Sequence, residues 1–102
     1  FKRLNDHINR ENAQLLCKGS VPEDIMHSGW FVPPTIFRDV DPSSPLWNEE
    51  LFGPVLACLR VETFEEALAC AGDSDYALTG GIFSRSPKNI QLAKDTFPVG
   101  NL

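Results

Sequence analysis

The sequence predicts an α/β fold in which helices cover a parallel sheet, a three-layer αβα arrangement. Residues 55–61 (VLACLRV) are nearly all apolar, as expected for a strand buried on both faces of a parallel sheet. Two segments with helix start signals follow, and each is succeeded by a further strand candidate. Connections of helical length join parallel strands through right-handed crossovers. Residues 48–102 therefore read as a β-α-β-α-β unit.

The first predicted helix of that unit begins at Thr63. Thr63 and Glu66 form a capping box, in which each side chain satisfies a free N–H group at the helix start. Apolar residues then recur at the spacing of one helix face, and Gly72 suits the helix stop. The face consists of Phe64, Ala67, Leu68 and Ala71.

The second predicted helix begins with Ser86 as its cap and Pro87 at its first position. Three of its apolar residues, Ile90, Ala93 and Phe97, are expected to face inward. The strand before this helix lies within residues 77–84, where Gly80-Gly81 permits a close backbone approach. Another strand is expected to open at Val99.

Residues 1–47 are expected to form a helix, short strands and proline-rich loops. Leu4 and Ile8 lie four residues apart in the polar segment 1–12, which favours an amphipathic helix. Two short apolar runs are strand candidates, residues 13–17 and 35–37. Two segments rich in turn-forming residues are predicted loops, residues 19–30 and 39–45.

Length, charge and cysteine content limit the class of protein. The 102 residues suffice for one small domain, and the net charge of −5 disfavours nucleic acid or an anionic membrane as a partner. No apolar run approaches the roughly 18 residues of a membrane span. Cys17, Cys58 and Cys70 lack CxxC spacing and indicate reduced thiols in a cytoplasmic compartment. Because the chain opens on Phe1 and ends in an apolar stretch, we expect it to be a piece of a longer protein.

The stretch of residues 48–55 (NEELFGPV) is the leading candidate site. It joins an acid, an aromatic ring, glycine and proline directly before the longest apolar run. Glu50 and Phe52, two residues apart, can present a hydrogen-bond acceptor and a flat face to one ligand. Without further context, a carboxylate in such a loop is more often simply solvated.

Three segments resemble the aldehyde dehydrogenase superfamily in its catalytic domain. Residues 29–37 (GWFVPPTIF) resemble its strand entry, residues 49–55 (EELFGPV) its E-(I/L)-F-G-P-V signature, and residues 76–84 (YALTGGIFS) a later strand. Their order and spacing also fit, so the resemblance covers nearly the whole chain. Gly80-Gly81 and residues 99–102 (VGNL) look most like the 1-pyrroline-5-carboxylate dehydrogenase branch, which also occurs within a bifunctional proline-utilisation protein.

The resemblance assigns roles to two residues of the candidate site. Glu50 matches the family glutamate that hydrogen-bonds the ribose hydroxyls next to the nicotinamide, and Phe52 matches the aromatic residue that packs beside that ribose and ring. Gly53-Pro54 would set the backbone. The chain departs from the family pattern at Ala77, where glycine is usual, and at Leu51, where isoleucine is common.

The family oxidises aldehydes to carboxylic acids with NAD or NADP, through attack by a cysteine thiolate. The resemblance therefore implies a cytoplasmic, homo-oligomeric enzyme that converts L-glutamate γ-semialdehyde to glutamate in proline catabolism. The family's nucleophilic cysteine and general base fall before residue 1, so the 102-residue chain is expected to be inactive by itself. Its partners would be the remaining catalytic and cofactor-binding domains.

Other interpretations stay open. The chain could be a non-catalytic, aldehyde-dehydrogenase-like interaction module, or belong to an enzyme for a different aldehyde. Ligands of open α/β sheets usually bind at the carboxyl ends of strands, which points to residues 60–62 and to Ser84-Arg85-Ser86, the latter as an anion site at a helix N-terminus. The three cysteines lack an adjacent histidine and read as buried thiols. His7 and His27 lie too far apart for a helix-borne metal pair.

Overall fold

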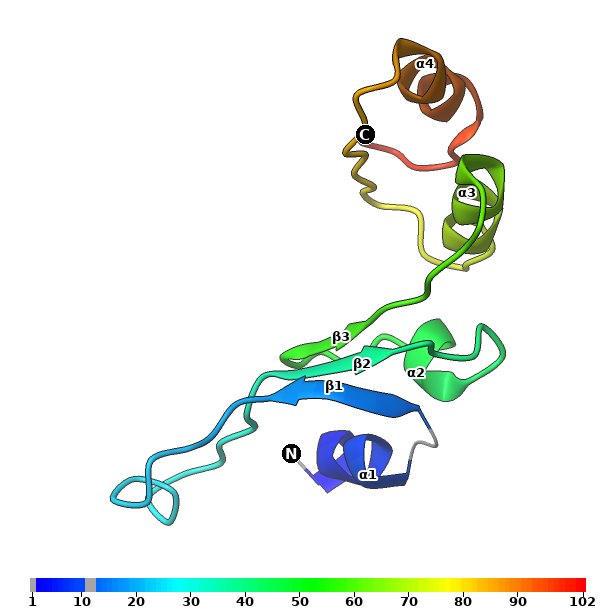
Figure 1. Cartoon of the computed structure of the whole chain (residues 1–102). Coiled ribbons are helices and arrows are strands. Elements are labelled where there is room, and N and C mark those ends of the chain that lie inside the picture. The colour runs from blue at the N-terminus through cyan, green and yellow to red at the C-terminus, as the bar shows by residue number, and fades with distance from the viewer. Residues whose placement is uncertain (1, 11–12) are drawn as a thin grey trace. The chain divides into compact units, whose positions relative to one another are not determined.

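The computed structural model describes residues 2–10 and 13–102. The chain divides into two compact units, Phe1–Arg60 and Val61–Leu102, which are described separately (Figure 1). Within the described ranges, no helix has the length and apolar character needed to cross a membrane. The helix predicted over residues 1–12 is present as α1 (Lys2–Arg10), and residues 1, 11 and 12 lie outside the described part.

The first unit contains a mixed sheet, whereas the sequence predicted a parallel one. Its strands are β1 (Gln14–Lys18), β2 (Thr35–Arg38) and β3 (Val55–Ala57), in the order β1-β2-β3. β1 pairs with β2 antiparallel, and β2 pairs with β3 parallel. The difference has a topological reason: a returning loop joins β1 to β2, whereas the connection from β2 to β3 is a crossover that carries a short helix, α2 (Pro45–Asn48).

The core of the first unit lies on one face of this sheet. Leu4 and Ile8 of α1 meet Phe37 of β2, and Val40 and Leu46 complete the cluster of buried side chains. The four-residue spacing in α1 thus does bury one helix face, as predicted. On β2, Thr35 is buried beside Phe37, and the strand is covered from this side.

The strand predicted over residues 55–61 is shorter and less buried than expected. β3 ends at Ala57, and its Leu56 is 55% exposed. Two more backbone hydrogen bonds follow, from Cys58 N to Phe37 O (2.9 Å) and from Val40 N to Cys58 O (3.1 Å). Asp39, with φ 51°, lies between these two bonds on the neighbouring chain and interrupts its extended geometry there.

The connection from β1 to β2, residues 19–34, extends away from the sheet (Figure 1). Its neck is closed by a hydrogen bond from Gly19 N to Pro34 O of 2.8 Å. Met26 N donates to Pro22 O within a turn at the far end, and most of the segment is exposed. The prediction of a loop over residues 19–30 is confirmed.

The first helix of the second unit, α3 (Phe64–Gly72), confirms its start signal. Thr63 Oγ1 accepts a hydrogen bond from Glu66 N at 3.1 Å. The Glu66 carboxylate closes the cap one residue earlier than in the standard box, because it accepts from Glu62 N at 3.0 Å. Leu68 is buried on the inner face. Ala71 is exposed, which corrects its predicted place on that face.

The second helix, α4 (Pro87–Thr96), also begins where predicted. Ser86 Oγ accepts from Asn89 N at 3.3 Å. Ala93 is completely buried and Phe97 is partly buried, as expected. Ile90 is 36% exposed, so it is less buried than expected.

The strands predicted at residues 77–84 and from Val99 are reduced to a single parallel bridge, Thr79 with Asn101. The direction of the pairing is therefore as predicted, but its length is not. Parallel pairs are stable when both faces are covered. Here Leu78 is 84% exposed and Phe83 is fully exposed, so nothing described in this unit supports a longer ladder.

Candidate functional site

Glu50 and Phe52 lie together on the wall of one hollow in the first unit. The hollow has a volume of about 290 Å³ and is formed by the end of α2, the loop of residues 49–54 and β3. The lining residues are Leu46, Glu49, Glu50, Leu51, Phe52, Gly53, Val55 and Ala57. The structure thus brings together the two side chains that the sequence singled out.

The 49–54 loop is anchored at its start by α2. The helix opens with proline at its first position, after Ser44, and Glu49 N closes it by donating to Pro45 O at 2.8 Å. Leu46 places its side chain in the core with 5% exposure. Asn48 Nδ2 donates to Pro42 O at 2.6 Å, which ties the helix back to the preceding turn.

The loop is anchored at its other end by the sheet. Val55 N donates to Gly53 O at 2.8 Å, and Thr35 N of β2 donates to Pro54 O at 2.9 Å. Leu51 is partly buried against the core of the unit. These contacts hold the backbone on both sides of Phe52, and the Gly-Pro pair fits this tight entry into a strand.

Phe52 combines an unfavourable backbone with an exposed ring. Its φ is 52°, in the left-handed region that non-glycine residues rarely adopt, and its side chain is 88% exposed. Such conformations persist where neighbouring structure imposes them, and they concentrate at ligand sites. The sequence predicted the ring but carried no signal for this backbone conformation.

Glu50 presents a carboxylate that is available to a ligand. The residue is exposed, and no described residue forms a hydrogen bond or ion pair with its carboxylate. Its main-chain oxygen, in contrast, accepts a hydrogen bond from Arg3 Nη2 of α1 at 3.1 Å. An ionised carboxylate can accept two hydrogen bonds from a diol, and the neighbouring ring offers a flat apolar surface. The pair therefore suits a sugar joined to a flat heterocycle, such as the nicotinamide ribose of NAD.

The second candidate, Ser84-Arg85-Ser86, lies at the start of α4. Ser86 N donates to Ser84 Oγ at 3.1 Å, and Asn89 N donates to Ser86 Oγ. Two N–H groups of the helix start are thus already bonded to side chains, which leaves fewer for an anion. Arg85 lines a separate hollow of about 430 Å³ together with Ile82, Phe83 and Ser84. Of residues 60–62, Arg60 lies 4.0 Å from Asp39 in an exposed ion pair.

The aldehyde dehydrogenase family model matches residues 1–102. The chain belongs to the aldehyde dehydrogenase family. It is similar to 1-pyrroline-5-carboxylate dehydrogenase of Geobacillus kaustophilus, with 45% identity over 95 residues that cover 93% of this chain and 18% of the relative. The enzyme of the same name from Bacillus licheniformis is 39% identical over 104 residues, covering 100% of this chain and 20% of the relative.

Solved structures of the aldehyde dehydrogenase fold agree with the structure of this chain. Proline utilization A (PutA) from Bdellovibrio bacteriovorus, inactivated by N-propargylglycine, gives a TM-score of 0.90 at 47% identity and covers 99% of this chain and 10% of that one. A 1-pyrroline-5-carboxylate dehydrogenase from Thermus with bound NAD gives 0.81 at 38% identity, covering 99% and 19%. This aldehyde dehydrogenase chain spans about a fifth of the length of the curated relatives it matches. The resemblance read from the three sequence motifs is confirmed.

The three cysteines of this aldehyde dehydrogenase chain lie outside the hollow. Cys17 is exposed on β1, and Cys58 and Cys70 are partly buried. Among the described residues, none of them is hydrogen-bonded to a histidine, so no thiol is paired with a base there. The exposure of Cys17 corrects the expectation that all three thiols are buried, because β1 has a fully exposed pattern.

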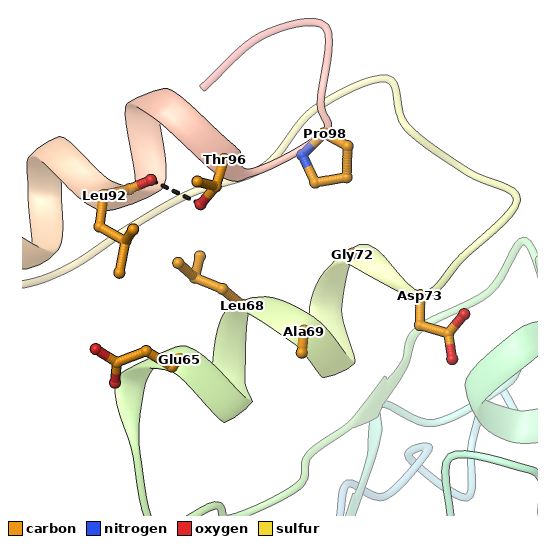
Figure 2. A pocket seen from close by; sticks show the side chains of 8 residues that line it. All are labelled: Glu65, Leu68, Ala69, Gly72, Asp73, Leu92, Thr96 and Pro98. Carbon is orange, nitrogen blue, oxygen red and sulfur yellow. Dashed lines mark hydrogen bonds between the residues drawn. The ribbon is translucent and has the colours of Figure 1, made fainter.

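A larger hollow of about 450 Å³ lies between α3 and α4 in the second unit (Figure 2). Leu68 and Leu92 extend into the space between the two helices, while Glu65 and Asp73 stand at opposite ends of α3. Thr96 Oγ1 already donates to Leu92 O at 2.7 Å. The hollow offers an apolar lining with carboxylates at its rim, and it was not predicted because it depends on how two separate helices pack.

Proposed function

We propose that this chain is the cofactor-orienting part of an NAD(P)-dependent aldehyde dehydrogenase that oxidises L-glutamate γ-semialdehyde to glutamate. Membership of the family supports the reaction class. The names of the relatives, 1-pyrroline-5-carboxylate dehydrogenases at about 40% identity, support the substrate. A structural neighbour with bound NAD supports the cofactor.

Within this proposal, Glu50 accepts hydrogen bonds from the two hydroxyls of the nicotinamide ribose, and Phe52 packs beside the ribose and the ring. The observation that carries it is that a carboxylate with no partner among the described residues and an exposed ring lie on the wall of one hollow. When bound, NAD(P) would supply the electron acceptor. The two side chains would only orient it, and correct orientation of a reacting group accounts for a large part of an enzymatic rate.

The proposal assigns the remaining machinery to other parts of the same protein. The nucleophilic cysteine, the general base and the rest of the cofactor site would come from the remainder of a three-layer αβα catalytic domain and from a second domain. The complete enzyme is proposed to be a cytoplasmic homo-oligomer. The 102 residues by themselves would then show no NAD-dependent oxidation of aldehydes.

The substitution Glu50→Gln in the complete enzyme tests the assigned role. Glutamine keeps the size of the side chain but removes the charge and one acceptor oxygen. We expect kcat/KM for NAD to fall about tenfold or more, the range for losing a hydrogen bond to a charged group. The matched control is Glu23→Gln, an exposed glutamate of the 19–34 loop that does not line the hollow.

Unchanged kinetics of Glu50→Gln would remove Glu50 from the cofactor site. The substrate is tested separately, by comparing kcat/KM for L-glutamate γ-semialdehyde with that for simple aliphatic aldehydes. Preference for a simple aldehyde would leave the cofactor role intact and place the enzyme elsewhere in the family.

A further inference from the structure

We propose that α1 positions the cofactor-binding loop, and that Arg3 is a positioning residue for Glu50 and Phe52. The proposal rests on the function proposed above for these two side chains. It concerns a helix that lies far from the loop in the sequence and whose described side chains are not among those that line the hollow. Two independent contacts carry it.

The first contact is the hydrogen bond from Arg3 Nη2 to Glu50 O, at 3.1 Å. It joins residues 47 positions apart in the chain. The guanidinium binds the main chain of Glu50 and leaves the carboxylate unoccupied. A hydrogen bond to the main chain fixes the backbone position of Glu50 without occupying the carboxylate oxygens that would bind the ligand. A charged donor makes this hydrogen bond stronger than a neutral donor would.

The second contact is the packing of Leu4 against Gly53. A Cβ atom at Gly53 would lie 3.1 Å from Leu4 Cδ1 and 3.2 Å from Leu4 Cγ, and it would overlap Leu4 Cδ2. Gly53 does not have a positive φ, so its lack of a side chain is needed for this close approach and not for its backbone conformation. The helix therefore touches the loop on both sides of Phe52.

α1 can act in this way because it is itself fixed. Leu4 and Ile8 are each 8% exposed and belong to the core cluster that includes Phe37 of β2. The helix thus links the position of the sheet to the loop, in addition to the bonds at the two ends of the loop and the packing of Leu51 against the core. Support by rigid neighbouring elements is what keeps the geometry of a site within a fraction of an ångström.

The test uses Arg3→Met and Arg3→Lys in the complete enzyme, with Lys2→Met as the matched control on the same helix. Hydrogen exchange is followed at the amides that close the two ends of the loop, Glu49 and Val55. We expect exchange there to be about fivefold faster in Arg3→Met, the effect of one lost hydrogen bond, and unchanged in α3 and α4. We also expect kcat/KM for NAD to fall about fivefold, with recovery in Arg3→Lys and no change in Lys2→Met.

The outcomes separate this inference from the proposed function. Unchanged exchange in Arg3→Met overturns it, as does faster exchange throughout α3 and α4, which would indicate general destabilisation. Faster loop exchange with unchanged kinetics also overturns it if Glu50→Gln is impaired. If Glu50→Gln is unimpaired as well, the cofactor role of Glu50 fails, while faster loop exchange still supports positioning of the loop by Arg3.

A second substitution tests the Leu4 contact. Gly53→Ala should also speed exchange at Glu49 and Val55, because its methyl group pushes the loop away from α1. Combining it with Leu4→Ala removes the overlapping methyl groups. The double variant should therefore be less impaired than the sum of the two single variants. Strict additivity would show that the two residues do not meet and would overturn this part of the inference.

Discussion

The paired glycines of the second unit offer a stringent test of the packing, because the structure places them in opposite surroundings. A Cβ atom added at Gly80 would lie 3.1 Å from Cδ1 and from Cζ of Phe97 and would overlap its Cε1. A Cβ atom added at Gly81 would have no neighbour within 4 Å. Neither glycine has a positive φ, so alanine is compatible with both backbones.

The overlap at Gly80 cannot be relieved easily. Gly80 N is bound to Asn101 O at 2.9 Å, so its backbone is held by the parallel bridge. On its other side, the Phe97 ring lies next to Gly72, with Cδ2 4.0 Å from the position of a Cβ atom there. Either the ring must leave its place or the bridge must open.

The magnitude follows from two opposing terms. Overpacking of this kind destabilises by about 1–3 kcal/mol, whereas replacing glycine by alanine stabilises by about 0.4–1 kcal/mol through the unfolded chain. The second term is common to both substitutions and cancels in their comparison. We therefore expect Gly80→Ala to be about 1–3 kcal/mol less stable than Gly81→Ala, and Gly81→Ala to be slightly more stable than the unaltered chain.

Urea unfolding followed by circular dichroism at 222 nm gives both free energies of unfolding. Hydrogen exchange at the amides of Gly80 and Asn101 then shows whether the loss is at the bridge. The usual scatter when the effects of separate substitutions are added is about 0.5 kcal/mol. If the free energies of unfolding of the two alanine variants agree within that margin, the described contact between Gly80 and Phe97 does not exist in solution.

Three further predictions concern a helix cap, a titrating carboxyl group and a strained backbone. Thr63→Ala should lower the free energy of unfolding by about 1 kcal/mol, the usual effect of a lost cap. Ser44→Ala should not lower it, because the Ser44 hydroxyl is buried without a partner among the described residues and makes no cap bond. Equal losses of the two variants in urea titrations would contradict this prediction. The main-chain N–H and then the hydroxyl of Ser43 bind the carboxylate of Asp41 and lower its pKa. The stabilisation that these two hydrogen bonds give the folded chain is complete above the ordinary carboxyl pKa and is lost as pH falls through the lowered pKa. Ser43→Ala removes the hydroxyl and should therefore raise the pKa of Asp41 in an NMR titration. An unchanged pKa would refute the assignment. Phe52→Asn should raise the free energy of unfolding by up to about 1 kcal/mol, since asparagine tolerates left-handed geometry, while it weakens binding of NADH in a fluorescence titration; a stability loss would show that the φ of Phe52 is not strained.

The helices of the second unit could be predicted from the sequence because their signals are local. A capping side chain at Thr63 or Ser86 and the proline after Ser86 act within one helical turn, so neighbouring residues suffice to place each start. The same serine-proline signal precedes α2, at Ser44-Pro45, and could have predicted that short helix, which begins at the last residue of the loop predicted over residues 39–45.

Strand length and burial could not be predicted in this way, because they depend on a partner elsewhere in the chain. The apolar run from Val55 to Val61 would suit a long buried strand, but β3 pairs with β2 over Val55–Ala57, and Asp39 interrupts the extended geometry of the neighbouring chain just beyond β2. Ala71 and Ile90 fit the helical period, yet each is less buried than that period predicts. An apolar pattern thus indicates which residues can be buried, and packing decides which of them are.

In the candidate site too, features with a local sequence signal could be predicted and features that depend on distant residues could not. The signature motif identified Glu50 and Phe52, and the structure places both on one hollow. The motif gave no indication of the support from Arg3, since a contact across 47 residues has no local pattern. The left-handed conformation of Phe52 was likewise hidden, because phenylalanine is an unusual residue for it.

The hydrogen bond at the neck of the 19–34 loop makes this segment a suitable place for inserting a tag or a fluorescent label. Gly19 N and Pro34 O are joined at 2.8 Å, so the two ends of the loop that would carry the insert are held together. Lengthening a flexible loop is thermodynamically mild, at about 0.6 kcal/mol for each doubling. An epitope placed near Asp24, in the exposed turn, would report on the protein without disturbing the hollow that carries Glu50 and Phe52.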